Sequence, residues 1–73
     1  MNVELDYERN RLSKAARAVL GEVDEYFIYY EKAKKEKPPV IRLAAKDKIT
    51  LGASLKRLKL DGKDLLYKGV EVL

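Results

Sequence analysis

The chain contains neither cysteine nor histidine among its 73 residues. Without cysteine, neither a disulfide nor a thiolate metal site can stabilise the fold. Without histidine, the chain lacks the most common general base, the most common metal ligand and the side chain that titrates near neutral pH. These absences predict a protein that holds no metal ion and no cofactor.

Long apolar runs are absent as well. No stretch approaches the roughly 20 apolar residues that are needed to span a bilayer. The N-terminus also lacks the basic start, apolar run and cleavage site of a secretion signal. We therefore expect a cytoplasmic protein whose partners do not include a membrane.

The length limits how much of the chain can be buried. The chain forms one domain, residues 1–73, and a chain of this size buries only about 60% of its unfolded surface. Such a monomer is marginally stable unless something supplements its core. Because disulfides and metals are excluded, we expect a homo-oligomer, most simply a dimer.

Charge is distributed unevenly around a formal net charge of +4. Residues 1–31 carry four basic and seven acidic side chains, whereas residues 32–73 carry twelve basic and five acidic ones. This split favours head-to-tail contacts between copies, or binding of the basic half to a polyanion such as nucleic acid. The alternative is a lysine-rich solvated surface without a binding role.

A stripe of apolar residues recurs at alternating spacings of four and three residues, which is the pattern of a helix face. Its members are Leu12, Ala16, Val19, Val23, Tyr26, Tyr30 and Ala33. Leu20 and Phe27 widen the stripe, and a wide stripe favours packing on a sheet or on several helices over a strict two-stranded coil. We predict a mainly helical region over residues 1–37, whose stripe is partly core and partly offered to a partner.

Pro38-Pro39 ends this helix near Glu36, because proline disfavours helical geometry at the preceding residue and has no N–H donor. A straight helix over residues 3–36 would be about 50 Å long, too long for a compact chain of this size. The chain therefore bends near Asn10 or Gly21, or shares the helix with a partner. Residues 2–7 alternate in polarity, so a short leading strand is an alternative start.

Residues 26–30, Tyr-Phe-Ile-Tyr-Tyr, fit either a helix or a strand. These residue types prefer strands, but the stripe keeps its phase through them and the lysines that follow are typical of a helix C-terminus. We favour the helix, in which Ile28 and Tyr29 indicate a second contact, with the C-terminal half.

The C-terminal part, residues 38–73, is predicted to combine a strand, a short helix and a hairpin. Residues 40–43 are typical of a short strand, and Asp61-Gly62 is typical of a type I′ turn between two strands. A competing interpretation makes residues 50–60 a helix. The predicted fold class is α+β: a long N-terminal helix, with Gly21 as one bend position, packed on a small C-terminal antiparallel sheet with a hairpin at Asp61-Gly62.

No pattern in the chain points to catalysis. A nucleophile elbow, a phosphate loop, metal-ligand spacing and an isolated carboxylate pair are all missing, so we expect no enzymatic activity. Tyrosine and other large apolar side chains are favoured in protein interfaces. The sequence thus predicts a non-catalytic protein-binding module of adaptor or inhibitor type, which binds a larger protein or self-associates through the stripe.

Two sets of residues carry the binding predictions. The protein-interface candidates lie on the helix: Leu12, Val19, Val23, Tyr26, Phe27, Ile28, Tyr29 and Tyr30. In the alternative function, a nucleic-acid-binding accessory protein, basic side chains of the C-terminal half contact phosphate. These candidates are Lys56, Arg57, Lys59 and Lys63.

Overall fold

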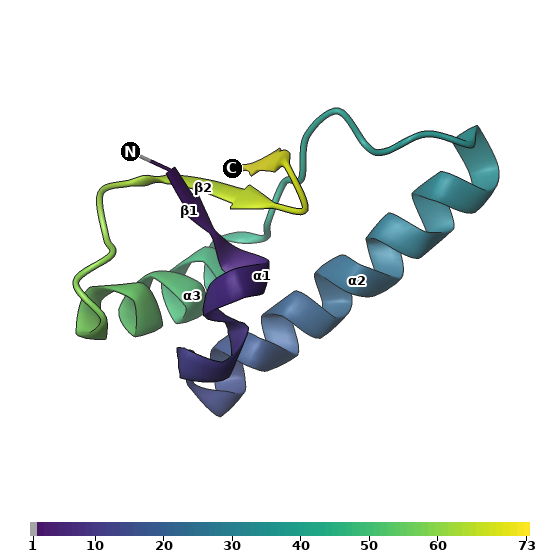
Figure 1. The fold of residues 1–73 in the computed structure, drawn as a ribbon. Coiled ribbons are helices and arrows are strands. Elements are labelled where there is room, and N and C mark those ends of the chain that lie inside the picture. Colours follow the sequence, from purple (N-terminus) through teal and green to yellow (C-terminus); the bar gives the residue numbers. More distant parts are fainter. Residues whose placement is uncertain (1) are drawn as a thin grey trace.

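The computed structural model describes residues 2–73, whose arrangement Figure 1 shows. Strand β1 (Asn2–Glu4) leads directly into the short helix α1 (Leu5–Glu8) and a 3-10 turn, η1 (Arg9–Arg11). Two longer helices follow, α2 (Lys14–Lys34) and α3 (Ala45–Arg57), and the chain ends in strands β2 (Asp64–Tyr67) and β3 (Val70–Val72). This combination of helices and a small sheet confirms the predicted α+β class.

The three strands form one mixed sheet in the order β1-β2-β3. β1 runs parallel to β2, with Val3 opposite Leu65, and β2 runs antiparallel to β3, with Leu66 opposite Glu71. A parallel pair needs a long crossover, and the helices between β1 and β2 supply it. The prediction of a purely antiparallel C-terminal sheet is wrong, because the N-terminal residues join the sheet as a parallel strand.

Helix α2 begins and ends at residues with recognisable capping geometry. The Oγ atom of Ser13, the N-cap, accepts a hydrogen bond from the Ala16 N–H at 3.2 Å, which satisfies one of the free N–H groups of the first turn. At the other end, Lys35 adopts a left-handed conformation (φ 57°), and its N–H donates at 2.7 Å to a carbonyl one turn earlier. The predicted stop near Glu36 and the helical form of residues 26–30 are both confirmed.

The long helix starts later than predicted and does not bend at Gly21. It begins at Lys14 rather than near residue 3, because residues 2–4 are paired with β2 in the sheet. The chain changes direction at η1 and at Leu12, whose extended backbone (ψ 156°) separates η1 from α2. The bend therefore lies near Asn10, the other of the two predicted positions.

The hairpin predicted at Asp61-Gly62 is also wrong. The turn that joins β2 to β3 is Lys68-Gly69, where both φ angles are positive (51° and 81°), as a type I′ turn requires. Asp61-Gly62 instead lies in the turn between α3 and β2. The residues before it form a helix, which was the competing interpretation, because two leucines of α3 lie one turn apart and are both buried in the core.

The core lies between the sheet and the two longer helices. Its largest fully buried side chains come from α1, α2, α3 and β2 in turn: Leu5, Leu20, Leu51 and Tyr67. Full burial of one leucine side chain contributes about 1.5–3 kcal/mol relative to exposure. The side of α2 that carries Leu20 faces this core. The two flanking sides of the helix can therefore make other contacts.

Candidate functional site

A groove runs beside α2, between this helix and the segment that leads into α3, and has a volume of about 480 Å³. The α2 residues that line it are Val19, Glu22, Val23, Tyr26 and Tyr30. The opposite wall consists of residues 39–44, followed by Asp47 of α3. The most buried lining side chains are apolar, since Ile41 is only 2% exposed and Val19 and Val23 are each 5% exposed.

Tyr26 and Tyr30 form the aromatic part of the groove. They lie one turn apart on α2, and their ring centroids are 6.0 Å apart with planes tilted by 52°. Tyr26 is 43% exposed, whereas the next residue, Phe27, is 3% exposed and belongs to the core. Because successive helix residues point about 100° apart, the burial of Phe27 places Tyr26 on the flank that faces the groove.

Three charged side chains line the groove: Glu22, Arg42 and Asp47. None of them takes part in an ion pair within residues 2–73. The chain reverses direction after Lys35, so the two walls run in opposite directions and the two carboxylates lie toward the same end. The groove therefore has an acidic end near α3 and an aromatic end near Tyr30.

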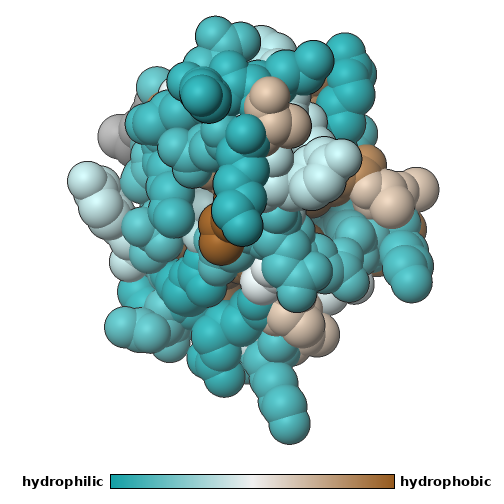
Figure 2. Space-filling view, turned by 90° about the vertical axis from the view of Figure 1, so that its right-hand side faces the viewer, coloured by the Kyte–Doolittle hydropathy of each residue, from teal (hydrophilic) through white to brown (hydrophobic). Residues whose placement is uncertain are grey.

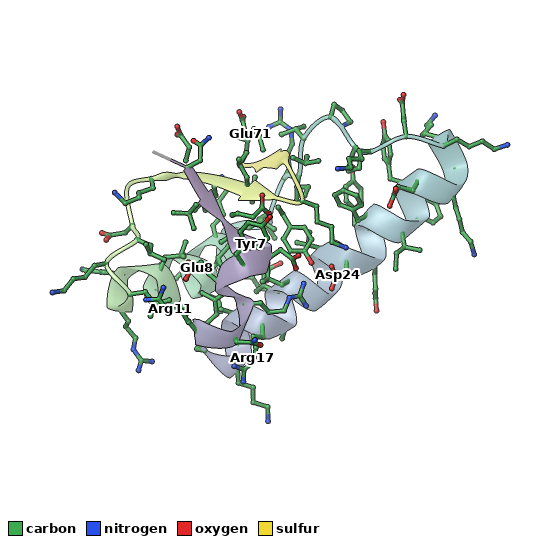
Figure 3. The ribbon with its side chains drawn as sticks, in the orientation of Figure 1. Tyr7, Glu8, Arg11, Arg17, Asp24 and Glu71 are labelled. Atoms are coloured by element: carbon green, nitrogen blue, oxygen red, sulfur yellow. The ribbon has the colours of Figure 1, made fainter. Side chains whose placement is uncertain are left out.

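A second cluster lies on the other flank of α2 and consists of Arg9, Asp24 and Tyr67; we call it the Tyr67 network. The Tyr67 hydroxyl donates to the Asp24 carboxylate and accepts from the Arg9 guanidinium, which also donates to Asp24 at 3.0 Å. Figure 3 shows Asp24 on the side of α2 that faces this cluster. Burial of Tyr67, together with its hydrogen bond to Asp24, raises the pKa of the hydroxyl well above the ordinary value of 10.0.

The Tyr67 network joins three elements of the fold. Its hydrogen bonds connect η1, α2 and β2. A hollow of about 390 Å³ lies beside it, with Asp6 and Lys68 among its lining residues. No sequence pattern indicates the network, because its hydrogen bonds connect residues 15, 43 and 58 positions apart.

The predicted protein-interface residues separate into three groups. Four are buried, each at most 5% exposed: Leu12, Val19, Val23 and Phe27. Two line the groove: Tyr26 and Tyr30. The other two lie outside the groove and are 59% and 72% exposed: Ile28 and Tyr29. Figure 2 shows one side of the molecule, on which apolar side chains form small separate patches among hydrophilic ones.

The predicted nucleic-acid contacts lie at the end of α3 and in the loop that follows. Lys56 and Arg57 are the last two residues of α3, and Lys59 follows in a left-handed conformation (φ 60°). These three side chains are exposed, whereas Lys63 is half-buried nearer to β2. None of the four lines the groove, so they belong to a separate surface.

None of the helices within residues 2–73 combines the length and the apolar character that crossing a bilayer requires. In the same part of the chain, no three Asp or Glu side chains are grouped as metal ligands would be. Comparisons of the chain with protein-family models, with curated proteins and with solved structures found no match. The groove is therefore identified as the candidate site from its own geometry.

Proposed function

We propose that this chain is a small non-catalytic protein-binding module and that the groove beside α2 is its binding surface. The observation that carries the proposal is the pair Tyr26 and Tyr30, whose rings line an apolar groove of about 480 Å³. Ligand sites in proteins are commonly concave, apolar and aromatic, with a few polar groups. Tyrosine is also enriched at the positions that dominate the energy of protein interfaces.

Both walls of the groove are held in place by the rest of the fold. α2 is anchored by Val23 and Phe27, which are buried next to the two tyrosines. The opposite wall is tied to β3, since the Ile41 N–H donates to the Glu71 carbonyl at 2.8 Å. Binding to a preformed surface avoids much of the entropy that is lost when a surface must first be ordered, which favours a binding role for this groove.

In this proposal, two copies of the chain would associate through fewer residues of the stripe than the sequence predicts. Leu12 and Phe27 are buried within the same chain, so two copies do not pair along the whole stripe. Contact between copies would use the part of the stripe that remains accessible, which includes Tyr26 and Tyr30. A second copy and a different protein would therefore compete for the same groove.

Selection from a phage-displayed library of random heptapeptides on the immobilised full chain tests the proposal. We expect the selected peptides to bind the wild type and to lose about tenfold or more in affinity for the Tyr26→Ala/Tyr30→Ala variant, because a dominant interface aromatic contributes about 2 kcal/mol or more. The matched control is Tyr29→Ala, which changes an exposed tyrosine outside the groove. Failure to select any peptide, or equal losses in the two variants, contradicts the proposal.

Nucleic-acid binding is a second candidate function, favoured by the basic residues at the end of α3. Lys56, Arg57 and Lys59 are exposed, and none forms an ion pair within residues 2–73. If they contact phosphates, the affinity for a duplex oligonucleotide falls with rising salt, with a log–log slope of about −0.9 per contact. Absence of binding at low salt contradicts this candidate.

A further inference from the structure

Within residues 2–73, the segment of residues 40–43, here called the edge segment, is paired on one side only. The Ile41 N–H donates to the Glu71 carbonyl at 2.8 Å, and the Ile41 carbonyl accepts from the Leu73 N–H at 2.8 Å. Backbone N–H and C=O groups alternate between the two sides of an extended chain. The groups of Val40 and Arg42 therefore point away from β3, and no hydrogen bond within residues 2–73 uses them.

The edge segment is also a wall of the groove. Residues 40–43 line the groove together with Tyr26 and Tyr30 from the opposite wall. An unpaired strand edge with a row of free N–H and C=O groups is a template for another strand. The tyrosines across the groove supply the apolar surface that alternate side chains of such a strand would contact.

We propose that the groove binds an extended segment of a partner protein, which adds to the sheet as a further strand beside Val40 and Arg42. The inference rests on the proposed protein-binding function and names the form in which the partner binds. Main-chain hydrogen bonds to Val40 and Arg42 fix the segment in register. Every second side chain of the segment then points toward α2, because side chains alternate along a strand.

The charged side chains that line the groove indicate which kind of segment fits. Two of the three charged side chains that line the groove are acidic and one, Arg42, is basic. Glu22 and Asp47 line the end nearest α3 without an ion-pair partner within residues 2–73, although the chain as a whole carries a net charge of +4. A lysine or arginine at the matching end of the segment complements these carboxylates. Such charges select between partners more than they raise affinity. The expected segment alternates apolar residues and carries a basic residue at one end.

The groove suits one extended segment better than a second folded copy. α2 lines the groove on the side toward which alternate side chains of the added strand point, so the space is limited to a strand whose side chains fit between the helix and the edge segment. The volume of about 480 Å³ lies within the range of sites that enclose small ligands, about 300–1,000 Å³. A few side chains of a single segment fill such a volume.

The matched variants Arg42→Pro and Arg42→Ala test the strand edge directly. Both remove the arginine side chain, but only proline removes the N–H that points away from β3, and that N–H has no partner within residues 2–73 of the free chain. With the heptapeptides selected on the full chain as probes, we expect Arg42→Pro to bind about tenfold more weakly than Arg42→Ala, because an unmade hydrogen bond leaves the peptide carbonyl unpaired. Equal affinities for the two variants overturn the inference.

Amide hydrogen exchange of the wild-type chain, with and without peptide, keeps the inference testable if Arg42→Pro fails to fold. We expect the Val40 and Arg42 amides to exchange quickly in the free chain and at least tenfold more slowly in the complex. N-methylation of alternate peptide amides is expected to abolish binding.

Peptides whose binding depends on Tyr26 but that leave the Val40 and Arg42 amides unprotected overturn the strand addition and leave the proposed function standing. Protection that appears without peptide and grows with chain concentration identifies a second copy as the occupant and overturns the inference.

Discussion

The buried hydroxyl of Tyr67 on β2 donates a hydrogen bond to the carboxylate of Asp24 on α2, 43 residues earlier in the chain. Arg9 donates to both groups, so that η1, α2 and β2 meet at this point. The contact holds one flank of α2 against the sheet. The opposite flank then presents Tyr26 and Tyr30 to the groove, so the network and the candidate site are linked through the orientation of one helix.

Replacing Tyr67 with phenylalanine removes the hydroxyl and keeps the ring in the core. Because the Asp24 carboxylate then loses a partner in a half-buried site, we expect the free energy of unfolding to fall by about 1–3 kcal/mol. Urea denaturation of the full chain measures this change. Tyr7→Phe is the matched control, since Tyr7 is 84% exposed. Equal losses in the two variants would show that the network does not stabilise the fold.

The raised pKa of Tyr67 makes its contribution to stability dependent on pH. Burial and the hydrogen bond to Asp24 disfavour the phenolate in the folded chain, so the pKa lies above the ordinary value of 10.0. The resulting stability is fully present below pH 10 and is lost as the pH rises above it, by at most about 1.4 kcal/mol per pH unit. We expect the stability difference between wild type and Tyr67→Phe to shrink above pH 10. A difference that stays constant in denaturation experiments over this range contradicts the prediction.

Val23→Asp tests whether the stripe belongs to the core of its own chain. Val23 is 5% exposed, so the carboxylate would be buried without a partner, and we expect a loss of roughly 3 kcal/mol or more, or failure to fold. Tyr29→Asp is the control, because its side chain is 72% exposed and the change should stay within about 0.5 kcal/mol. Thermal unfolding followed by circular dichroism compares the two. A Val23→Asp chain as stable as Tyr29→Asp would mean that the stripe is not core.

Alanine substitutions at two glycines are expected to have opposite signs. Gly69 has a φ of 81° in the turn between β2 and β3, where an L-residue costs about 1–2 kcal/mol. Gly21 lies inside α2 and an added Cβ meets nothing within 4 Å, so alanine should stabilise the chain by about 0.5–1 kcal/mol. Urea denaturation measures both. A neutral Gly69→Ala variant would argue against the turn at Lys68-Gly69.

The parts of the fold that were predicted correctly have local causes. The end of α2 follows from Pro38-Pro39 and from the spacing of its apolar residues, both visible in a short stretch of sequence. The parts that were missed have distant causes, since β1 is a strand because Val3 pairs with Leu65. Asp61-Gly62 is the stronger local hairpin signal, but the burial of α3 leucines in the core makes the preceding residues a helix.

The sequence predicts one of the two walls of the candidate site. The sequence predicts Tyr26 and Tyr30 as interface residues from their type and their place on the stripe. It does not predict the opposite wall, because the groups that we propose to bind there are backbone groups, which every residue has. The backbone N–H and C=O groups of Val40 and Arg42 have no partner within residues 2–73. Only the pairing of Ile41 with β3 in the structure shows this.

The central claim is that the groove beside α2 binds a protein segment. Mapping of NMR chemical shifts, as a selected heptapeptide is added to the full chain, tests it most directly. The account predicts that the largest shifts fall on Tyr26, Tyr30, Val40 and Arg42. Shifts confined to the basic end of α3, at Lys56 and its neighbours, or spread over no defined surface, would contradict it.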